Sequence, residues 1–206
     1  MMVYGYTVSF YKLAIVNDID FNPARQKLAE QINQTLGKVK VLQLTSALLA
    51  ESTAGADLLA LTLHPKKEIA FRAAWILENL FWADPLRFID DIDDLATKLP
   101  LVKNESSLRH YFKILIQLTD KRIDKQIAQK ISAMDMEPVI SRCFDLLIDE
   151  SSPIALKVFA MELLFNLRHR EDWITETLIG QIQLLMEDGG PAIRARGRMV
   201  LRKLMR

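Results

Sequence analysis

Four stretches of this sequence close with the same pattern of apolar residues, and this internal repeat constrains the fold more than any other feature. The stretches align on a closing leucine, which is Leu80, Leu118, Leu167 or Leu204. The residue three positions earlier is always leucine, the one four positions earlier is always apolar, and the one seven positions earlier is small in three stretches. These spacings place the residues on one side of an α-helix. The sequence therefore predicts a repeated helical unit.

The distances between the closing leucines indicate one insertion. Successive closing leucines are 38, 49 and 37 residues apart. An additional helical segment near residues 123–133 accounts for the longer interval. We therefore expect a helical repeat with one extra helix between its second and third closing leucines.

Prolines and glycines mark where the helices begin and end. Residue pairs 22–23, 84–85, 152–153 and 190–191 each place a capping-type residue before a proline at the first helical position. Gly37 follows the first predicted helix, and Gly189 and Gly190 precede the last. These signals divide the chain into five helix pairs: 23–36 with 39–51, 55–63 with 66–81, 85–98 with 105–119, 137–149 with 152–168, and 173–187 with 190–205.

The expected architecture is a single all-α domain over residues 22–206. One helix pair alone leaves an apolar face exposed, so neighbouring pairs must stack to form a continuous core. Half of the 206 residues are hydrophobic and 26% are charged, which suits a globular helical chain. Residues 1–21 form an N-terminal segment of uncertain structure, in which residues 3–8 have a β-type composition.

The lone cysteine and the N-terminal residues indicate the cellular compartment in which the protein is expected. Cys143 lies between Arg142 and Phe144 and is expected to be a small buried hydrophobe, as suits a reducing cytoplasm. The apolar stretch 1–16 has no basic leader, contains Lys12, and is too short to span a bilayer. We expect a cytoplasmic protein without a membrane segment.

The second helix of each predicted pair resembles the second helix of HEAT and armadillo repeats. The resemblance rests on a proline, a short gap, an apolar residue, Arg, Ala and a leucine-rich close, and it extends over most of residues 22–206. Residues 71–77, 143–145 and 192–196 look more specifically like a little-characterised bacterial family of HEAT-like proteins. The resemblance implies an α-α superhelix, a HEAT-like solenoid of about five antiparallel helix pairs.

Members of that bacterial family sometimes carry the label adenylosuccinate lyase, but we do not assign this activity to the present chain. The lyase superfamily has far longer chains and a Ser-Ser-x-Met-Pro-type signature loop that closes over the substrate. No stretch of this sequence corresponds to that loop. We therefore expect a non-enzymatic chain.

The second helices also carry a predicted binding ridge on the side away from the closing leucines. At 100° per residue, the ridge positions of residues 68–82 fall within about 80° of one another. In HEAT and armadillo stacks, these helices line the concave surface. The candidate binding residues are Arg72, Trp75, Asn79, Trp82, His110, Lys113, Gln117, Phe159, Glu162, Asn166 and Arg196.

This ridge predicts a scaffold that binds an unidentified protein or peptide partner. Side-chain amides can donate to and accept from a peptide backbone, and a neighbouring Trp can form the wall of a side-chain pocket. Trp75 with Asn79 resembles the Trp and Asn ladder by which armadillo importins hold extended peptides. The alternative is a solvated face of amphipathic helices, with Trp75 and Trp82 partly covered by the N-terminal segment.

Other kinds of site are weaker hypotheses. The acidic run 90–94 has a magnesium-type spacing but no second acidic cluster, and His64, His110 and His169 are scattered, so we expect no metal and no cofactor. A HEAT-like DNA glycosylase is the best enzyme alternative. Six cations without an acid occupy residues 189–206, which leaves about −5 for the rest of the chain. That net charge disfavours nucleic acid as a partner.

Overall fold

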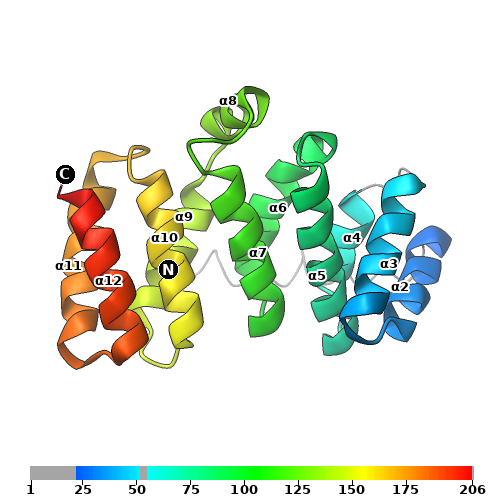
Figure 1. The fold of residues 1–206 in the computed structure, drawn as a ribbon, viewed down its shortest axis with the longest axis horizontal. Helices are drawn as coiled ribbons and strands as arrows, with labels where there is room; N and C mark the ends of the chain where they lie inside the picture. Colours follow the sequence, from blue (N-terminus) through cyan, green and yellow to red (C-terminus); the bar gives the residue numbers. More distant parts are fainter. Residues whose placement is uncertain (1–21, 52–54, 206) are drawn as a thin grey trace, which may run out of the picture. The chain divides into compact units, whose positions relative to one another are not determined.

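The computed structural model describes residues 22–51 and 55–205, and it confirms the prediction of an all-α chain. The described residues contain eleven α-helices, two short 3₁₀ segments and no strand. The α-helices are α2 (Pro23–Gln34), α3 (Gly37–Ala50), α4 (Gly55–Leu61), α5 (Lys67–Ala83), α6 (Ile92–Lys98), α7 (Glu105–Leu118), α8 (Lys125–Ala133), α9 (Glu137–Ile148), α10 (Ile154–Leu167), α11 (Asp172–Asp188) and α12 (Pro191–Leu204) (Figure 1). The β-type composition of residues 3–8 lies outside the described residues.

The chain divides into two compact units, and the boundary between them in the sequence falls within α7. The first unit ends at Tyr111 and the second begins at Phe112. The predicted insertion is confirmed as α8, in the second unit. A single domain over residues 22–206 stays a prediction.

The first unit packs around α5. Helices α2, α3 and α4 all pack against it, and α3 and α5 lie side by side (Figure 1). The repeat positions Ala73, Ile76, Leu77 and Leu80 are fully buried there, as the apolar pattern predicts. Seven positions before a closing leucine, Tyr111 is the one residue that is not small. Its hydroxyl is fully buried and shares a 2.6 Å hydrogen bond with Thr62.

The second unit packs around α10, which contacts α9, α11 and α12. Leu163, Leu164 and Ala160 of α10 are fully buried. The small residue predicted on α12, Gly197, lies close against α11: a Cβ there would lie 2.6 Å from Sδ of Met186, so that side chain would have to move. Leu204, the last closing leucine, is only half-buried.

The local signals succeed at some helix ends and fail at others. Asn22 caps α2, since its side chain accepts a 3.1 Å hydrogen bond from the Arg25 amide. The expected start at residues 152–153 was wrong by one residue. The first helical residue is Ile154, and the Ser152 hydroxyl instead donates to Asp149 at 2.9 Å. A continuous helix over 85–98 was also wrong, because buried Phe88 has non-helical angles and residues 86–91 form 3₁₀ turns.

Cys143 is buried, as expected, and burial raises the pKa of its thiol. None of the helices in the described part of the chain is both long and apolar enough to cross a membrane.

Candidate functional site

A cavity of about 300 Å³ lies in the first unit, between the α2–α3 joint and α5. We call it the aromatic pocket, because the rings of Phe71 and Trp75 form part of its wall. Two of the residues predicted on the binding ridge line it. Its lining residues are Thr35, Gly37, Val41, Glu68, Phe71, Arg72 and Trp75.

The turn between α2 and α3 gives the pocket one side. Helix α2 ends at Gln34, and Gly37 follows with a φ of +77°. This left-handed conformation is accessible to glycine without the strain that a Cβ causes. The reversal brings Thr35 and Val41 opposite the residues of α5 that complete the lining.

The indole ring of Trp75 is held by two neighbouring rings. Its centroid lies 5.7 Å from that of Phe71, on the preceding turn of α5. The imidazole of His110, from α7, stacks on the indole with a centroid distance of 6.1 Å and an interplanar angle of 16°. Because both neighbours restrict the ring, Trp75 presents a defined face to the pocket.

His110 is itself fixed by a buried carboxylate. Its Nδ1 hydrogen-bonds Oε2 of Glu78, and these residues are 8% and 3% exposed. The prediction of His110 on an exposed ridge was wrong, since the ring lies between Phe71, Trp75 and Glu78. Sequence reasoning missed Glu78. The available signal was an acid at a core position of α5, between the buried residues Ala74 and Phe81.

The side chain of Arg72 mainly joins two helices of the fold. Its Nη1 donates to the carbonyl oxygen of Asn33 at 2.7 Å, at the C-terminal end of α2. A cation at this position pairs with carbonyls that have no partner within the helix and with the negative end of the helix dipole. Arg72 therefore ties α2 to α5 beside the aromatic pocket.

The other two ridge residues of α5 lie outside the pocket lining. Nδ2 of Asn79 donates to the carbonyl oxygen of Trp75 at 2.7 Å, within the same helix. Trp82 is 53% exposed. The structure thus brings Trp75 and Arg72 together at one cavity and separates Asn79 and Trp82 from it.

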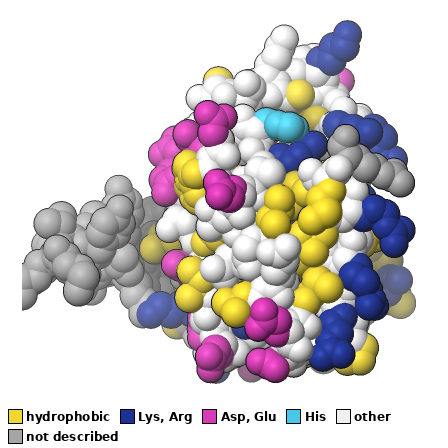
Figure 2. Space-filling model, turned by 90° about the vertical axis from the view of Figure 1, so that its left-hand side faces the viewer, with side chains coloured by type: hydrophobic (Ala, Val, Ile, Leu, Met, Phe, Trp, Pro, Cys, Tyr) yellow, Lys and Arg dark blue, Asp and Glu magenta, His cyan; other side chains and the backbone are white. Residues whose placement is uncertain are grey.

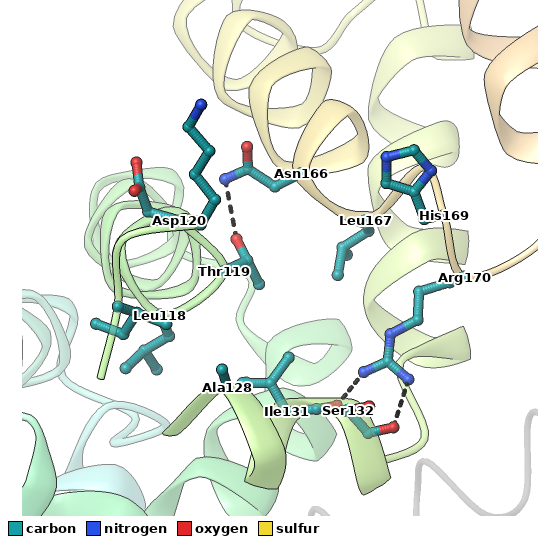
Figure 3. Close-up of a pocket in the computed structure, with 12 residues that line it drawn as sticks. Leu118, Thr119, Asp120, Ala128, Ile131, Ser132, Asn166, Leu167, His169 and Arg170 are labelled. Carbon is teal, nitrogen blue, oxygen red and sulfur yellow. Dashed lines mark hydrogen bonds between the residues drawn. The ribbon is translucent and has the colours of Figure 1, made fainter. Parts of the chain in front are cut away.

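A second cavity, of about 330 Å³, lies in the second unit (Figure 3). We call it the polar pocket, because most of its lining side chains carry a hydrogen-bonding group. The segment after α7, the inserted helix α8 and the end of α10 form its walls. Its lining residues are Leu118, Thr119, Asp120, Lys121, Ile123, Ala128, Ile131, Ser132, Asn166, Leu167, His169 and Arg170.

Hydrogen bonds hold two of the polar side chains in place. Nδ2 of Asn166 donates to Oγ1 of Thr119 at 3.0 Å and to the carbonyl oxygen of Ile116 at 3.2 Å. The guanidinium of Arg170 points to the end of α8 and donates to the carbonyl oxygen of Ser132 at 3.0 Å (Figure 3). It also donates to the carbonyl oxygen of Ile131. Arg170 thus caps α8 as Arg72 caps α2.

The acid in the polar pocket already has a partner. Both oxygens of Asp120 accept from Arg122, at 2.9 and 3.1 Å. These hydrogen bonds lower the pKa of the Asp120 carboxyl to about 2. Lys121 and His169 are exposed at the same pocket, so the groups it offers to a ligand are mainly donors.

Three of the five remaining predicted ridge residues of the second unit, Phe159, Glu162 and Arg196, make side-chain contacts with another part of the unit. Phe159 of α10 stacks on Phe112 with a centroid distance of 6.4 Å and an interplanar angle of 11°. Glu162 forms a 3.1 Å ion pair with Arg196 of α12. Gln117 and Lys113 are half-buried on α7. Among the described residues, Oε1 of Gln117 is buried without a hydrogen-bond partner.

The acidic run does not assemble a metal site in the described part of the chain. No group of three His, Cys, Asp or Glu side chains that could hold a metal occurs within residues 22–51 and 55–205. Burial raises the pKa of the Asp91 carboxyl, and the charges of Asp94 and Asp90 raise it further.

Comparison with known proteins adds one finding. A family model described as a HEAT repeat domain matches residues 28–204. Neither a comparison with curated proteins nor one with solved structures found a match. The matched range begins inside α2 and ends with α12, so it contains every residue that lines the two pockets.

Proposed function

The chain belongs to the HEAT repeat domain family, and from this premise we propose that it is a protein-binding scaffold whose aromatic pocket receives a side chain of the partner. HEAT repeats generally mediate protein interactions. The observation that carries the proposal is the cavity beside Phe71 and Trp75, on a second helix where the ridge was predicted.

The size and lining of the aromatic pocket favour one class of partner group. Its volume of about 300 Å³ is at the lower end of the range for ligand pockets. Two aromatic rings and Val41 supply apolar surface. An aromatic or large aliphatic side chain of a partner would bury its apolar surface there and form offset or edge-to-face contacts with the rings. We therefore propose a peptide segment with such a side chain as the ligand.

The packing around Trp75 supports a preformed site. Its ring contacts with Phe71 and His110, and the bond from His110 to Glu78, restrict the indole before any partner arrives. Binding then immobilises little on the scaffold side, which lowers the entropy cost of association. Rigid, well-packed aromatic residues are the usual anchors of an interface.

The polar pocket is a second proposed contact, with different chemistry. Its exposed donors, Lys121 and His169, suit a carboxylate or a backbone carbonyl rather than an apolar side chain. Because the pockets lie in separate units, each is proposed and tested separately.

The experiment is a selection from a display library of random peptides against the full chain. We expect the enriched peptides to share an aromatic or large aliphatic residue. Trp75→Ala should weaken their binding by about tenfold or more, as expected for loss of an interface anchor. Trp82→Ala is the matched control, since it removes an exposed Trp of the same helix that lies outside the pocket lining.

Circular dichroism and a melting curve must show that both variants stay folded. Chemical-shift changes at Val41, Phe71 and Trp75 on peptide addition would place the ligand in the aromatic pocket. Equal binding by parent and Trp75→Ala would contradict the proposal, as would a selection without any shared residue.

A further inference from the structure

Helices α11 and α12 present a face on which an apolar stripe lies between two rows of opposite charge (Figure 2). At 100° per residue, half-buried Ile179 and Met186 of α11 fall next to the acidic residues of that helix, and half-buried Leu201 of α12 falls next to the basic ones. Met205, just after α12, is 66% exposed. We call this surface the end face of the second unit.

The two charged rows follow from helical spacing. On α11, Asp172, Glu176 and Glu187 fall within about 60° of one another at 100° per residue, and all three are exposed. On α12, exposed Arg194, Arg198 and Arg202 recur every four residues and fall within about 80°. Each helix therefore carries one sign of charge along the end face.

The cations of α12 divide into two groups by their contacts. Those directed toward α10 are engaged, since Arg196 pairs with Glu162 at 3.1 Å and Nζ of Lys203 lies 5.3 Å from the ring centroid of Phe165. By contrast, Arg198 and Arg202 form no ion pair with any residue that the structure describes. Arg194, the third cation of the row, donates to the carbonyl oxygen of Glu187 at 3.3 Å. Arg198 and Arg202 are thus the end-face cations that are available to a partner.

We propose that the end face binds the end face of a second copy of this chain, around a twofold axis parallel to α11 and α12. Such a rotation sets α11 of one copy opposite α12 of the other, so each acidic row meets a basic row. A twofold axis in the plane of the face but perpendicular to the helices would set α11 against α11 and oppose like charges. Charge complementarity therefore selects both the second copy and its orientation.

The area of the end face determines how strongly the two copies are expected to bind. Helix α11 has 17 residues and is about 25 Å long, and two packed helices lie about 8 to 10 Å apart. A face of this size removes about 1,000 Å² from water in total, which is near the lower limit for a specific interface. The formal net charge of the chain is +1, so overall repulsion does not oppose pairing. The dimer is accordingly weak and reversible.

The experiment is sedimentation velocity on the full chain and on two charge-reversal variants. The first variant is Arg198→Glu with Arg202→Glu, and the second is Glu176→Lys with Glu187→Lys. Each variant alone opposes like charges and should raise the dissociation constant by about 100-fold. Mixed in equal amounts, the two variants restore opposite charges along both rows and should form a heterodimer.

The matched control is Lys38→Glu with Lys40→Glu, which reverses two exposed cations on α3 in the first unit. It should self-associate as the parent does. Circular dichroism confirms that each variant is folded. A parent that stays monomeric up to about 500 µM, well above the range of specific micromolar contacts, would overturn the proposal. Dimerisation of either variant at the strength of the parent, or failure of the mixture to pair, would overturn it equally.

Discussion

The aromatic pocket of the first unit and the polar pocket of the second each lie beside an arginine that caps the end of a helix. The two pockets differ in the residues that line them. In the first unit, Arg72 donates to a carbonyl at the C-terminal end of α2. In the second, Arg170 does the same for α8. Rings then line one cavity, whereas hydroxyl, amide and basic groups line the other. An arginine at a helix end thus lies beside each cavity, whereas the lining residues determine what each cavity could bind.

The largest expected effect is a loss of stability when the leucine three positions before a closing leucine is truncated, in either unit. Leu77→Ala in the first unit and Leu164→Ala in the second should each lower the free energy of unfolding by about 2 to 5 kcal/mol, because both side chains are fully buried. Denaturant titrations monitored by circular dichroism measure the loss. Leu201→Ala is the control, since Leu201 is only half-buried and its truncation should cost clearly less. An unchanged midpoint for either buried leucine would contradict its placement in the core.

Removing the capping arginines tests the feature that the two pockets share. Arg72→Ala and Arg170→Ala should each cost about 1 to 3 kcal/mol, because each leaves helix-end carbonyls without their charged donor. Thermal melts give the change in stability. The control is Arg122→Ala, whose side chain is 83% exposed and whose loss should change stability by less than about 0.5 kcal/mol. Arginine variants that melt like Arg122→Ala would show that the caps do not support the pockets.

A smaller effect should distinguish the two pockets. Gly37→Ala introduces a side chain at a φ of +77° and should cost about 1 to 2 kcal/mol, although no atom lies within 4 Å of the added Cβ. The peptide ligands of the aromatic pocket should then bind more weakly, because this joint forms part of its lining. NMR signals of Asn166 and His169, in the polar pocket, should stay unchanged. Changes in both pockets would contradict a local effect.

The helices were predictable from sequence because their signal is local. Spacings of three, four and seven around Leu80 or Leu167 fix which side of a helix is buried, whatever the neighbouring helix is. The break at Phe88 was not predictable in this way. Its ring is buried against Phe81, at a centroid distance of 5.4 Å, and that contact depends on packing rather than on periodicity.

The candidate site was predictable only in part, for the same reason. Trp75 and Arg72 were predicted on the same side of α5, which needs only helical geometry, and both line the aromatic pocket. The pairing of Glu78 with His110 joins residues 32 positions apart and requires knowledge of which helices meet. The amide of Asn79 bonds within its own helix, an alternative that residue spacing does not reveal.

The inserted helix α8 affects how the sequence of such a chain can vary. The apolar positions that hold α9, α10 and α12 together belong to the repeats themselves. Helix α8 supplies Ala128, Ile131 and Ser132 to the polar pocket from outside the five repeated pairs. Residues added between two modules can therefore create a pocket, and vary its lining, while the modules keep the hydrophobic pattern on which folding depends.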